Sequence, residues 1–151
     1  MEEDISNIDD IGIDLPDIPM PDENAQTQEI EDEFEGAYKF AIIGVGQGGS
    51  RIAETFWNLG YRRVCVINTA KQDLKYINIP EDRKLLLDHG GAGKDPETAE
   101  RIFQENSEEI CDFFRAKLGT TYDRVLVCAG AGGGTGAGGA PVVFKIAQEN
   151  T

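Results

Sequence analysis

The stretch Leu-Val-Cys-Ala-Gly-Ala-Gly-Gly-Gly-Thr-Gly-Ala-Gly-Gly-Ala-Pro at residues 126–141 decides the fold of this chain. It overlaps an apolar run of strand character, Val125–Ala129, and leads into an apolar segment with helical spacing, Pro141–Ala147, within a helix predicted at 140–149. Glycine costs chain entropy, so such a cluster is expected where backbone turns tightly or approaches another group closely. A strand, a glycine loop and a helix N-terminus together present backbone N–H groups to an anion. The stretch therefore predicts a phosphate-binding loop.

A second glycine loop follows another predicted strand. The apolar run Phe40–Val45 ends in Gly44-Val-Gly-Gln-Gly-Gly49, and residues 50–59 are predicted to form a helix. A further buried strand is predicted at Val64–Ile67, because three of its four residues are β-branched, and a polar loop follows at 68–73.

A third glycine loop, Gly91-Ala-Gly93, lies in the charged segment 82–94 and precedes a helix. Asp95 is a suitable N-cap for that helix, and Pro96 suits its first position. One apolar face is predicted for core packing, and it comprises Ala99, Ile102, Phe103, Ile110, Phe113 and Phe114. Strands that alternate with helices indicate an α/β domain with a parallel sheet, whose ligands bind at the carboxyl ends of the strands. The three glycine loops fall at those ends.

Charge divides the 151-residue chain into two parts. Residues 1–36 contain fourteen Asp and Glu and no Lys or Arg, whereas residues 37–151 contain fourteen residues of each sign. We expect 1–36 to be a disordered acidic arm. Its spaced aliphatic residues either fold onto an apolar groove of a protein partner or belong to a solubilising tail. Because neither part is basic, nucleic acid is not an expected partner.

Composition also restricts the cellular location of the protein and the kinds of catalysis it can perform. The three cysteines, Cys65, Cys111 and Cys128, lack metal-ligand spacing and are expected to be reduced thiols in the cytoplasm. His89 is the only histidine, which argues against nucleophile–histidine catalysis. No apolar run is long enough to span a membrane, so membrane insertion is not expected.

A nicotinamide dinucleotide site is one alternative. Gly44-x-Gly46-x-x-Gly49 fits the dinucleotide fingerprint, which also expects an acidic residue at the end of the second strand. Asn68 and Thr69 stand at that place. The alternative is therefore disfavoured, although the fingerprint itself is present.

Four motifs in a fixed order resemble the tubulin/FtsZ superfamily. The glycine run Gly132-Gly-Gly-Thr-Gly-Ala-Gly138 is similar to its signature. The others are Phe40-Ala-Ile-Ile-Gly-Val-Gly46, Val66-Ile-Asn-Thr-Ala-Lys-Gln-Asp-Leu74 and Gly91-Ala-Gly-Lys-Asp-Pro-Glu97. The resemblance covers residues 38–149. It implies a three-layer, Rossmann-like parallel sheet, with residues 37–151 as the N-terminal half of a GTPase domain that is incomplete at its C-terminus.

The resemblance also implies the site. Residues 47–51 would cradle the α- and β-phosphates and approach the guanosine, and 91–93 would sense the γ-phosphate. Residues 132–136 would grip the phosphates, with Thr135 supplying a hydroxyl. The implied nucleotide-binding residues are Gly46, Gln47, Gly48, Gly49, Ser50, Arg51, Asn68, Gly91, Ala92, Gly93, Gly132, Gly133, Gly134, Thr135 and Gly136.

The implied ligands are GTP and GDP, with Mg²⁺ accompanying GTP. The family's members polymerise head to tail and hydrolyse GTP where subunits meet. Their base-contacting segments and catalytic acid come later in the chain, so no catalytic residue and no metal ligand is assigned within 1–151. A nucleotide-regulated scaffold that does not hydrolyse GTP is the other reading.

Three positions depart from the FtsZ pattern. Arg51 stands where FtsZ has Asn, and it either pairs with a phosphate or lies on the helix surface. Gln47 instead resembles the tubulin version of the loop. Ala70 stands where FtsZ has Asp, and Lys94, beside the γ-phosphate loop, offers a charge that could compensate in part.

Overall fold

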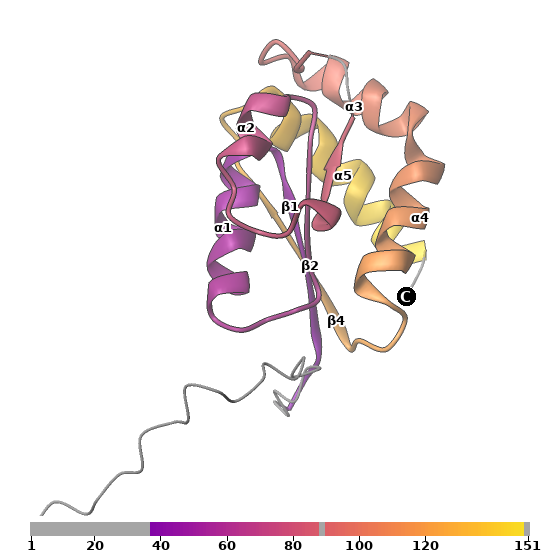
Figure 1. Cartoon of the computed structure of the whole chain (residues 1–151). Coiled ribbons are helices and arrows are strands. Elements are labelled where there is room, and N and C mark those ends of the chain that lie inside the picture. The colour runs from indigo at the N-terminus through magenta and orange to yellow at the C-terminus, as the bar shows by residue number, and fades with distance from the viewer. Residues whose placement is uncertain (1–36, 88–89, 150–151) are drawn as a thin grey trace, which may run out of the picture. The chain divides into compact units, whose positions relative to one another are not determined.

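The computed structural model describes residues 37–87 and 90–149 (Figure 1). The acidic arm at 1–36 and His89 lie outside these ranges, so the predictions made for them remain predictions. Within the described ranges, four strands form one sheet in the order β3-β2-β1-β4, and every pair of neighbours is parallel. The strands are β1 (Phe40–Val45), β2 (Val64–Asn68), β3 (Lys84–Leu86) and β4 (Arg124–Ala129).

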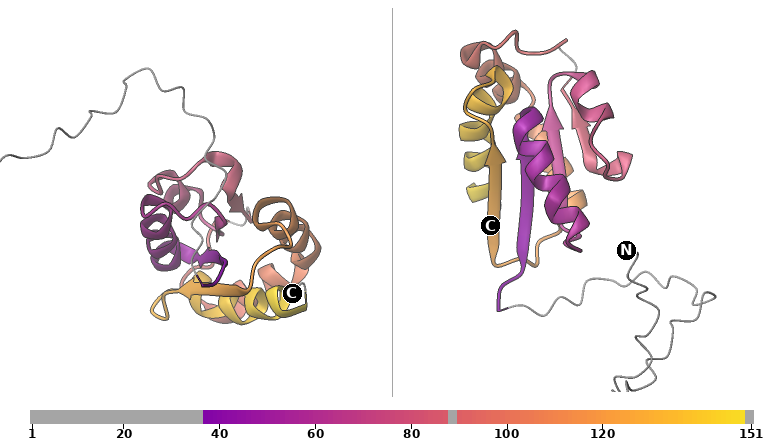
Figure 2. Two further views of the ribbon diagram at one scale, coloured as in Figure 1. Left: turned by 90° about the horizontal axis from the view of Figure 1, so that it is seen from below. Right: turned by 90° about the vertical axis from the view of Figure 1, so that its left-hand side faces the viewer.

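Helices cover both faces of the sheet, which confirms the predicted three-layer α/β fold (Figures 1 and 2). On one face lie α1 (Gly46–Asn58) and α2 (Lys71–Lys75), and on the other lie α3 (Pro96–Glu105), α4 (Ser107–Leu118) and α5 (Gly134–Glu149). The two faces follow from strand geometry, because successive side chains of a strand point to opposite sides.

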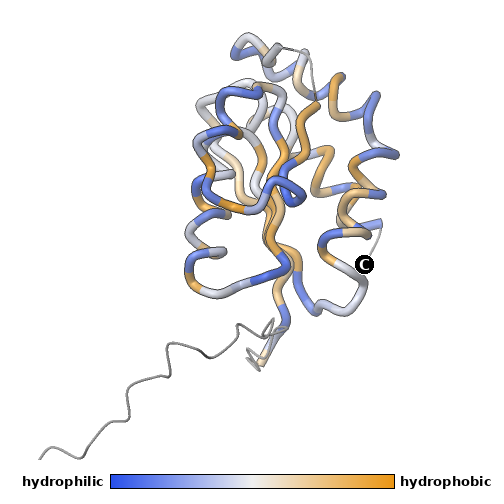
Figure 3. The backbone as a smooth tube through the Cα atoms, viewed as in Figure 1, coloured by the Kyte–Doolittle hydropathy of each residue, from blue (hydrophilic) through white to orange (hydrophobic). Residues whose placement is uncertain are grey.

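Two hydrophobic cores result from this alternation. Ile43, Cys65 and Ile67 pack with the helices α3, α4 and α5, whereas Ile42 and Val66 pack with α1 and the segment around α2. β1 and β2 are buried almost throughout, as expected for parallel strands covered on both faces. Figure 3 shows the same arrangement as apolar strands between helices that are polar on their outer sides.

Two helices begin earlier than the sequence predicts. α1 starts at Gly46 instead of Ser50, and α5 starts at Gly134 instead of Ala140, so both glycine loops run into the first helical turns. Glycine is a poor helix former in isolation, and the prediction followed that propensity. Tertiary packing overrides it here, because these turns lie directly against neighbouring backbone.

The segment between β2 and β4 also differs from the prediction. The short helix α2 begins inside the predicted polar loop 68–73 and ends two residues after it. The third strand, β3, lies in the charged segment 82–94. The predicted single helix after Asp95 is two helices that meet at Asn106. The Asn106 side chain donates to the carbonyl of Ile102 at 2.7 Å, and the Asn106 backbone N–H donates to the same carbonyl at 3.2 Å. Side-chain bonds of this kind to the preceding turn bend helices.

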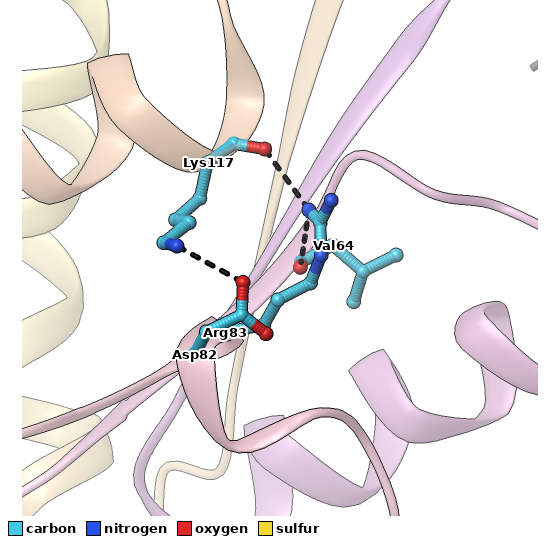
Figure 4. Close-up of polar contacts among 4 residues, drawn as sticks. All are labelled: Val64, Asp82, Arg83 and Lys117. Carbon is cyan, nitrogen blue, oxygen red and sulfur yellow. Dashed lines mark hydrogen bonds and ion pairs between the residues drawn. The ribbon is translucent and has the colours of Figure 1, made fainter. Parts of the chain in front are cut away.

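A polar network at the amino end of β2 connects the short helical turn η1 (Glu81–Arg83) with α4 (Figure 4). The Arg83 guanidinium donates to the carbonyl oxygens of Lys117 at 3.0 Å and Val64 at 3.5 Å. The Lys117 ammonium lies 3.0 Å from an Asp82 carboxylate oxygen, and this hydrogen bond lowers the pKa of Asp82. The network connects the turn before β3 to β2 and to the end of α4.

No helix within 37–87 or 90–149 is long and apolar enough to cross a membrane.

Candidate functional site

A cleft of about 580 Å³ lies at the carboxyl ends of β1, β2 and β4. Its walls come from the start of α1, the start of α2, the loop before α3 and the glycine run before α5. Because these segments all follow parallel strands or lead into helices at one edge of the sheet, the topology alone brings them together. The predicted site residues that line it are Gln47, Gly48, Gly91, Ala92, Gly93, Gly132, Gly133, Gly134, Thr135 and Gly136.

Five predicted site residues do not line the cleft. Gly46 is buried with φ at +70°, and a Cβ there would lie 2.9 Å from the amide nitrogen of Gly136, so only glycine fits without strain. Gly49 is buried against the backbone of β4, and the buried Ser50 hydroxyl donates to the Gly46 carbonyl at 2.7 Å. These three residues hold the loop in place.

Arg51 and Asn68 are the other two residues outside the cleft lining. Arg51 is exposed on α1, which favours the surface position over the phosphate-pairing position. Asn68 is fully buried at the end of β2, and its side-chain oxygen accepts from the backbone N–H of Thr69 at 2.8 Å and of Ala70 at 3.3 Å. Asn68 therefore fixes the backbone of residues 69 and 70, just before α2.

The first part of the glycine run faces open space. A Cβ added to Gly132 or Gly133 would meet no heavy atom within 4 Å, and α5 begins at the next residue. The first N–H groups of a helix have no partners within the helix, and its dipole places partial positive charge there. An anion in this part of the cleft would find backbone donors and no side chain in its way.

Two hydrogen bonds at Thr69 connect the segment after β2 with the glycine run and with the loop 91–94. The hydroxyls of Thr69 and Thr135 lie 2.8 Å apart, and either can be the donor. The Gly91 amide donates to the Thr69 carbonyl at 2.9 Å. Thr69 is fully buried, so one residue fixes both neighbouring walls of the cleft relative to the sheet.

The loop 91–94 carries the cleft's positively charged side chain. Lys94 has φ at +62°, in the left-handed region that non-glycine residues rarely adopt. Its backbone lies directly against Gly134, where an added Cβ would stand 2.7 Å from the Lys94 carbonyl carbon. The Asp95 amide closes the turn by donating to the Ala92 carbonyl at 2.9 Å. Packing and turn together hold Lys94 at the cleft.

Five lining residues were not among the predicted binding residues. The sequence singles out Ala70 and Lys94 beside the loops, but it does not single out Val45, Asp73 and Gly130. Asp73 is the informative one, because it and Lys94 are the charged residues among those that line the cleft. Asp73 falls three residues after Ala70, at a helical spacing that places both on one face. That spacing could have indicated a short helix, but the composition of the segment predicted a polar loop.

The pKa of the carboxyl group that caps α3 is lowered, whereas the pKa values of two cysteine thiols are raised. Asp95 caps α3, and the hydrogen bond from the Thr98 hydroxyl, followed by those from the backbone N–H groups of Thr98 and Glu97, lowers the pKa of its carboxyl. Burial raises the pKa of the Cys65 and Cys128 thiols, so both stay protonated at neutral pH and are poor nucleophiles. No disulfide joins the three cysteines, all of which lie in the described part of the chain, and Cys111 is half-buried rather than buried.

The family follows from these loops taken with their order along the chain. Residues 39–151 match the model of the tubulin/FtsZ family, GTPase domain. The chain belongs to the tubulin/FtsZ family. The cell division protein FtsZ 2 of Halobacterium salinarum is 42% identical over 125 residues, which make up 78% of this chain and 30% of that protein.

Two solved structures from the same family resemble the fold. The GDP-bound monomer of CetZ1 from Haloferax volcanii has a TM-score of 0.69 and 32% identity, covering 75% of this chain and 38% of that one. The GTPγS-bound protofilament of CetZ2 from Haloferax volcanii has a TM-score of 0.64 and 28% identity, covering 75% of this chain and 36% of that one. The chain spans about a third of the length of these relatives.

Proposed function

We propose that residues 37–151 form the phosphate-binding half of a guanine-nucleotide site in a polymer-forming GTPase of tubulin/FtsZ type. The observation that carries this proposal is the cleft, in which the open glycines of the run before α5 meet the loop 91–94 at the carboxyl edge of the sheet. Backbone N–H groups are the main donors there, which suits an oligophosphate. The GDP- and GTPγS-bound relatives supply the guanine part of the proposal.

Mg²⁺ fits the residues that are present. Magnesium binds through one or two carboxylates together with substrate phosphates, and Asp73 offers a carboxylate at the cleft. Bound Mg²⁺ would neutralise phosphate charge, while the chain's own residues orient the phosphates through backbone donors.

Hydrolysis and polymerisation belong to the whole protein in this proposal. Subunits would assemble head to tail, as the protofilament of CetZ2 suggests, and GTP would be cleaved where they meet. No residue within 37–87 or 90–149 is assigned a catalytic role. Cytoplasmic location is part of the same proposal, and the lack of a disulfide among the three described cysteines supports it. A protein partner for the acidic arm is also proposed.

Nucleotide-dependent melting tests the phosphate cleft. We expect GTPγS to raise the melting temperature most, GDP less, and guanosine and NAD little, because affinity comes from phosphate contacts. A ligand at 100 times its Kd stabilises the folded state by about 2.7 kcal/mol, which a melting curve resolves easily. Equal protection by guanosine and GTPγS would contradict the assignment.

Phosphate release by the whole protein separates a GTPase from a scaffold. If catalysis needs contact between subunits, specific activity rises steeply above a critical protein concentration. A flat, near-zero rate at every concentration at which filaments are visible would instead identify a scaffold that binds GTP without hydrolysing it.

A further inference from the structure

We infer that Asp73 is a protein ligand of the divalent cation that enters this cleft with a nucleoside triphosphate. The inference rests on the proposed function, because the cation is expected to arrive bound to the phosphates. It concerns a residue that the sequence did not single out and that stands three positions after Ala70, both of them lining the cleft.

Position is the first argument. Ala70 is the N-cap of α2 and Asp73 lies in its first turn, so the two side chains share a face of the helix. Ala70 presents only a methyl group, which a Cβ on Gly91 would approach to 3.9 Å. The start of α2 and the loop 91–94 therefore come close together at Ala70 and Gly91, and both border the cleft. Asp73 is the acidic residue among those that line the cleft.

Preorganisation is the second argument. The Asn68 side-chain nitrogen donates to one Asp73 carboxylate oxygen, Oδ2, at 3.3 Å. Asn68 is itself fixed, because it is fully buried and its side-chain oxygen accepts from the N–H groups of Thr69 and Ala70. Within 37–87 and 90–149, no further hydrogen bond to the Asp73 carboxylate is found, which leaves Oδ1 available to a ligand.

Charge chemistry is the third argument. A lone carboxylate in a phosphate cleft repels the phosphates, so its presence is unfavourable unless a cation lies between them. Mg²⁺ prefers hard oxygen ligands and tolerates a single carboxylate when phosphates and waters complete its shell. Lys94 lines the same cleft from the loop 91–94 and attracts the phosphates directly. The two charged residues thus act on different partners, Lys94 on phosphate and Asp73 on the cation.

The experiment measures cation affinity, not turnover. Mn²⁺ replaces Mg²⁺, and its binding to the protein saturated with GTPγS is followed by electron paramagnetic resonance in the wild type and in Asp73→Asn. The substituted side chain has the same shape, and its amide oxygen can still accept from Asn68, so the fold is retained. Melting without nucleotide checks this. Asp112→Asn is the matched control, because the Asp112 side chain is exposed on α4 and lies 3.8 Å from the Arg115 guanidinium.

We expect Asp73→Asn to lower the affinity for Mn²⁺ at least about tenfold, since even outer-shell changes at metal sites cost 10–100-fold. Affinity for GTPγS in EDTA should be unchanged or higher, because a negative charge has been removed from the phosphate cleft. Asp112→Asn should behave as the wild type does. Wild-type affinity for Mn²⁺ in Asp73→Asn would overturn this inference and leave the proposed function intact. Failure of the wild type to bind GTPγS at all would overturn both.

Discussion

The glycine run before and within α5 has an open half at 132–133 and a packed half at 134–138, and their surroundings differ. Gly132 and Gly133 border open space in the cleft, whereas Gly134, Gly136 and Gly138 lie against the backbone of other segments. A Cβ on Gly138 would collide with the carbonyl oxygen of Pro96 in α3. One half leaves room for a ligand, and the other lets two helices approach each other. The glycines of this signature therefore serve two physical requirements, space for a ligand and close packing of helices.

This difference makes the same substitution, glycine to alanine, informative at each position. In the packed half it should reduce folding stability. In the open half it should reduce ligand affinity and leave folding intact.

The largest effect is expected for Gly138→Ala. The methyl group would overlap the Pro96 carbonyl and lie 2.8 Å from the Cβ of Ala99. Overpacking of this kind costs about 1–3 kcal/mol, and a rigid backbone contact places it at the upper end. Urea unfolding without nucleotide measures the loss. Alanine is otherwise the better helix former by about 1 kcal/mol, so a stabilised variant would disprove the close contact.

Gly133→Ala should show the opposite pattern. Its φ is not in the left-handed region and its side is open, so we expect the free energy of unfolding to stay within about 0.5 kcal/mol of the wild type. Affinity for GTPγS should fall about tenfold, or about 1.4 kcal/mol, because the methyl group enters the phosphate space. Isothermal titration measures the second quantity. Unchanged affinity would mean that phosphates do not contact this half.

Lys94 relates to both halves, because its backbone packs on Gly134 and the residue lines the cleft that Gly132 and Gly133 border. Lys94→Ala and Lys94→Gly should both weaken GTPγS binding, by about fivefold, and GDP binding less, because a triphosphate carries more negative charge. Lys94→Gly should also raise folding stability by about 0.5–1 kcal/mol by relieving the left-handed conformation. Lys71→Ala is the control, because Lys71 is exposed on α2 and does not line the cleft. Equal losses for both nucleotides would remove the charge argument.

The smallest effect concerns Asp95, whose amide lies 2.7 Å from the position of a Cβ on Gly134. Hydrogen bonds from Thr98 and Glu97 hold the pKa of its carboxyl below the ordinary value of about 3.9. The carboxylate therefore stabilises the fold at neutral pH, and this contribution is lost as pH falls from about 4 through the lowered pKa. Asp95→Asn, which can still cap α3, should flatten the acid limb of a plot of melting temperature against pH. An unchanged limb would assign the acid sensitivity to other carboxyls.

Local sequence predicted much of this molecule, because buried parallel strands and glycine loops have strong signals. β1, β2 and β4, the α/β class and the edge of the sheet that holds the cleft were all confirmed. The starts of α1 and α5 were wrong because glycine propensity favours a loop, whereas packing against Cys128 and Pro96 makes the backbone helical there.

Other features depended on contacts that no local pattern carries. β3 is three residues long, and pairing with β2 defines it. The break at Asn106 interrupts an apolar spacing that reads as one helix. The contribution of Asp73 to the cleft needed the short helix α2, and that helix was hidden in a polar segment.

The hydroxyl pair of Thr69 and Thr135 has a consequence for how the cleft responds to its contents. Each hydroxyl has one hydrogen to give, and one of the two is spent on the bond between them. If a phosphate oxygen accepts the hydrogen of Thr135, the bond between the threonines must be supplied by Thr69. A phosphate in the cleft would thus fix the direction of a single, partly buried hydrogen bond, for which either threonine can otherwise be the donor. Thr69 adjoins both Asn68 and Ala70, so this direction is set next to the start of the helix that carries Asp73.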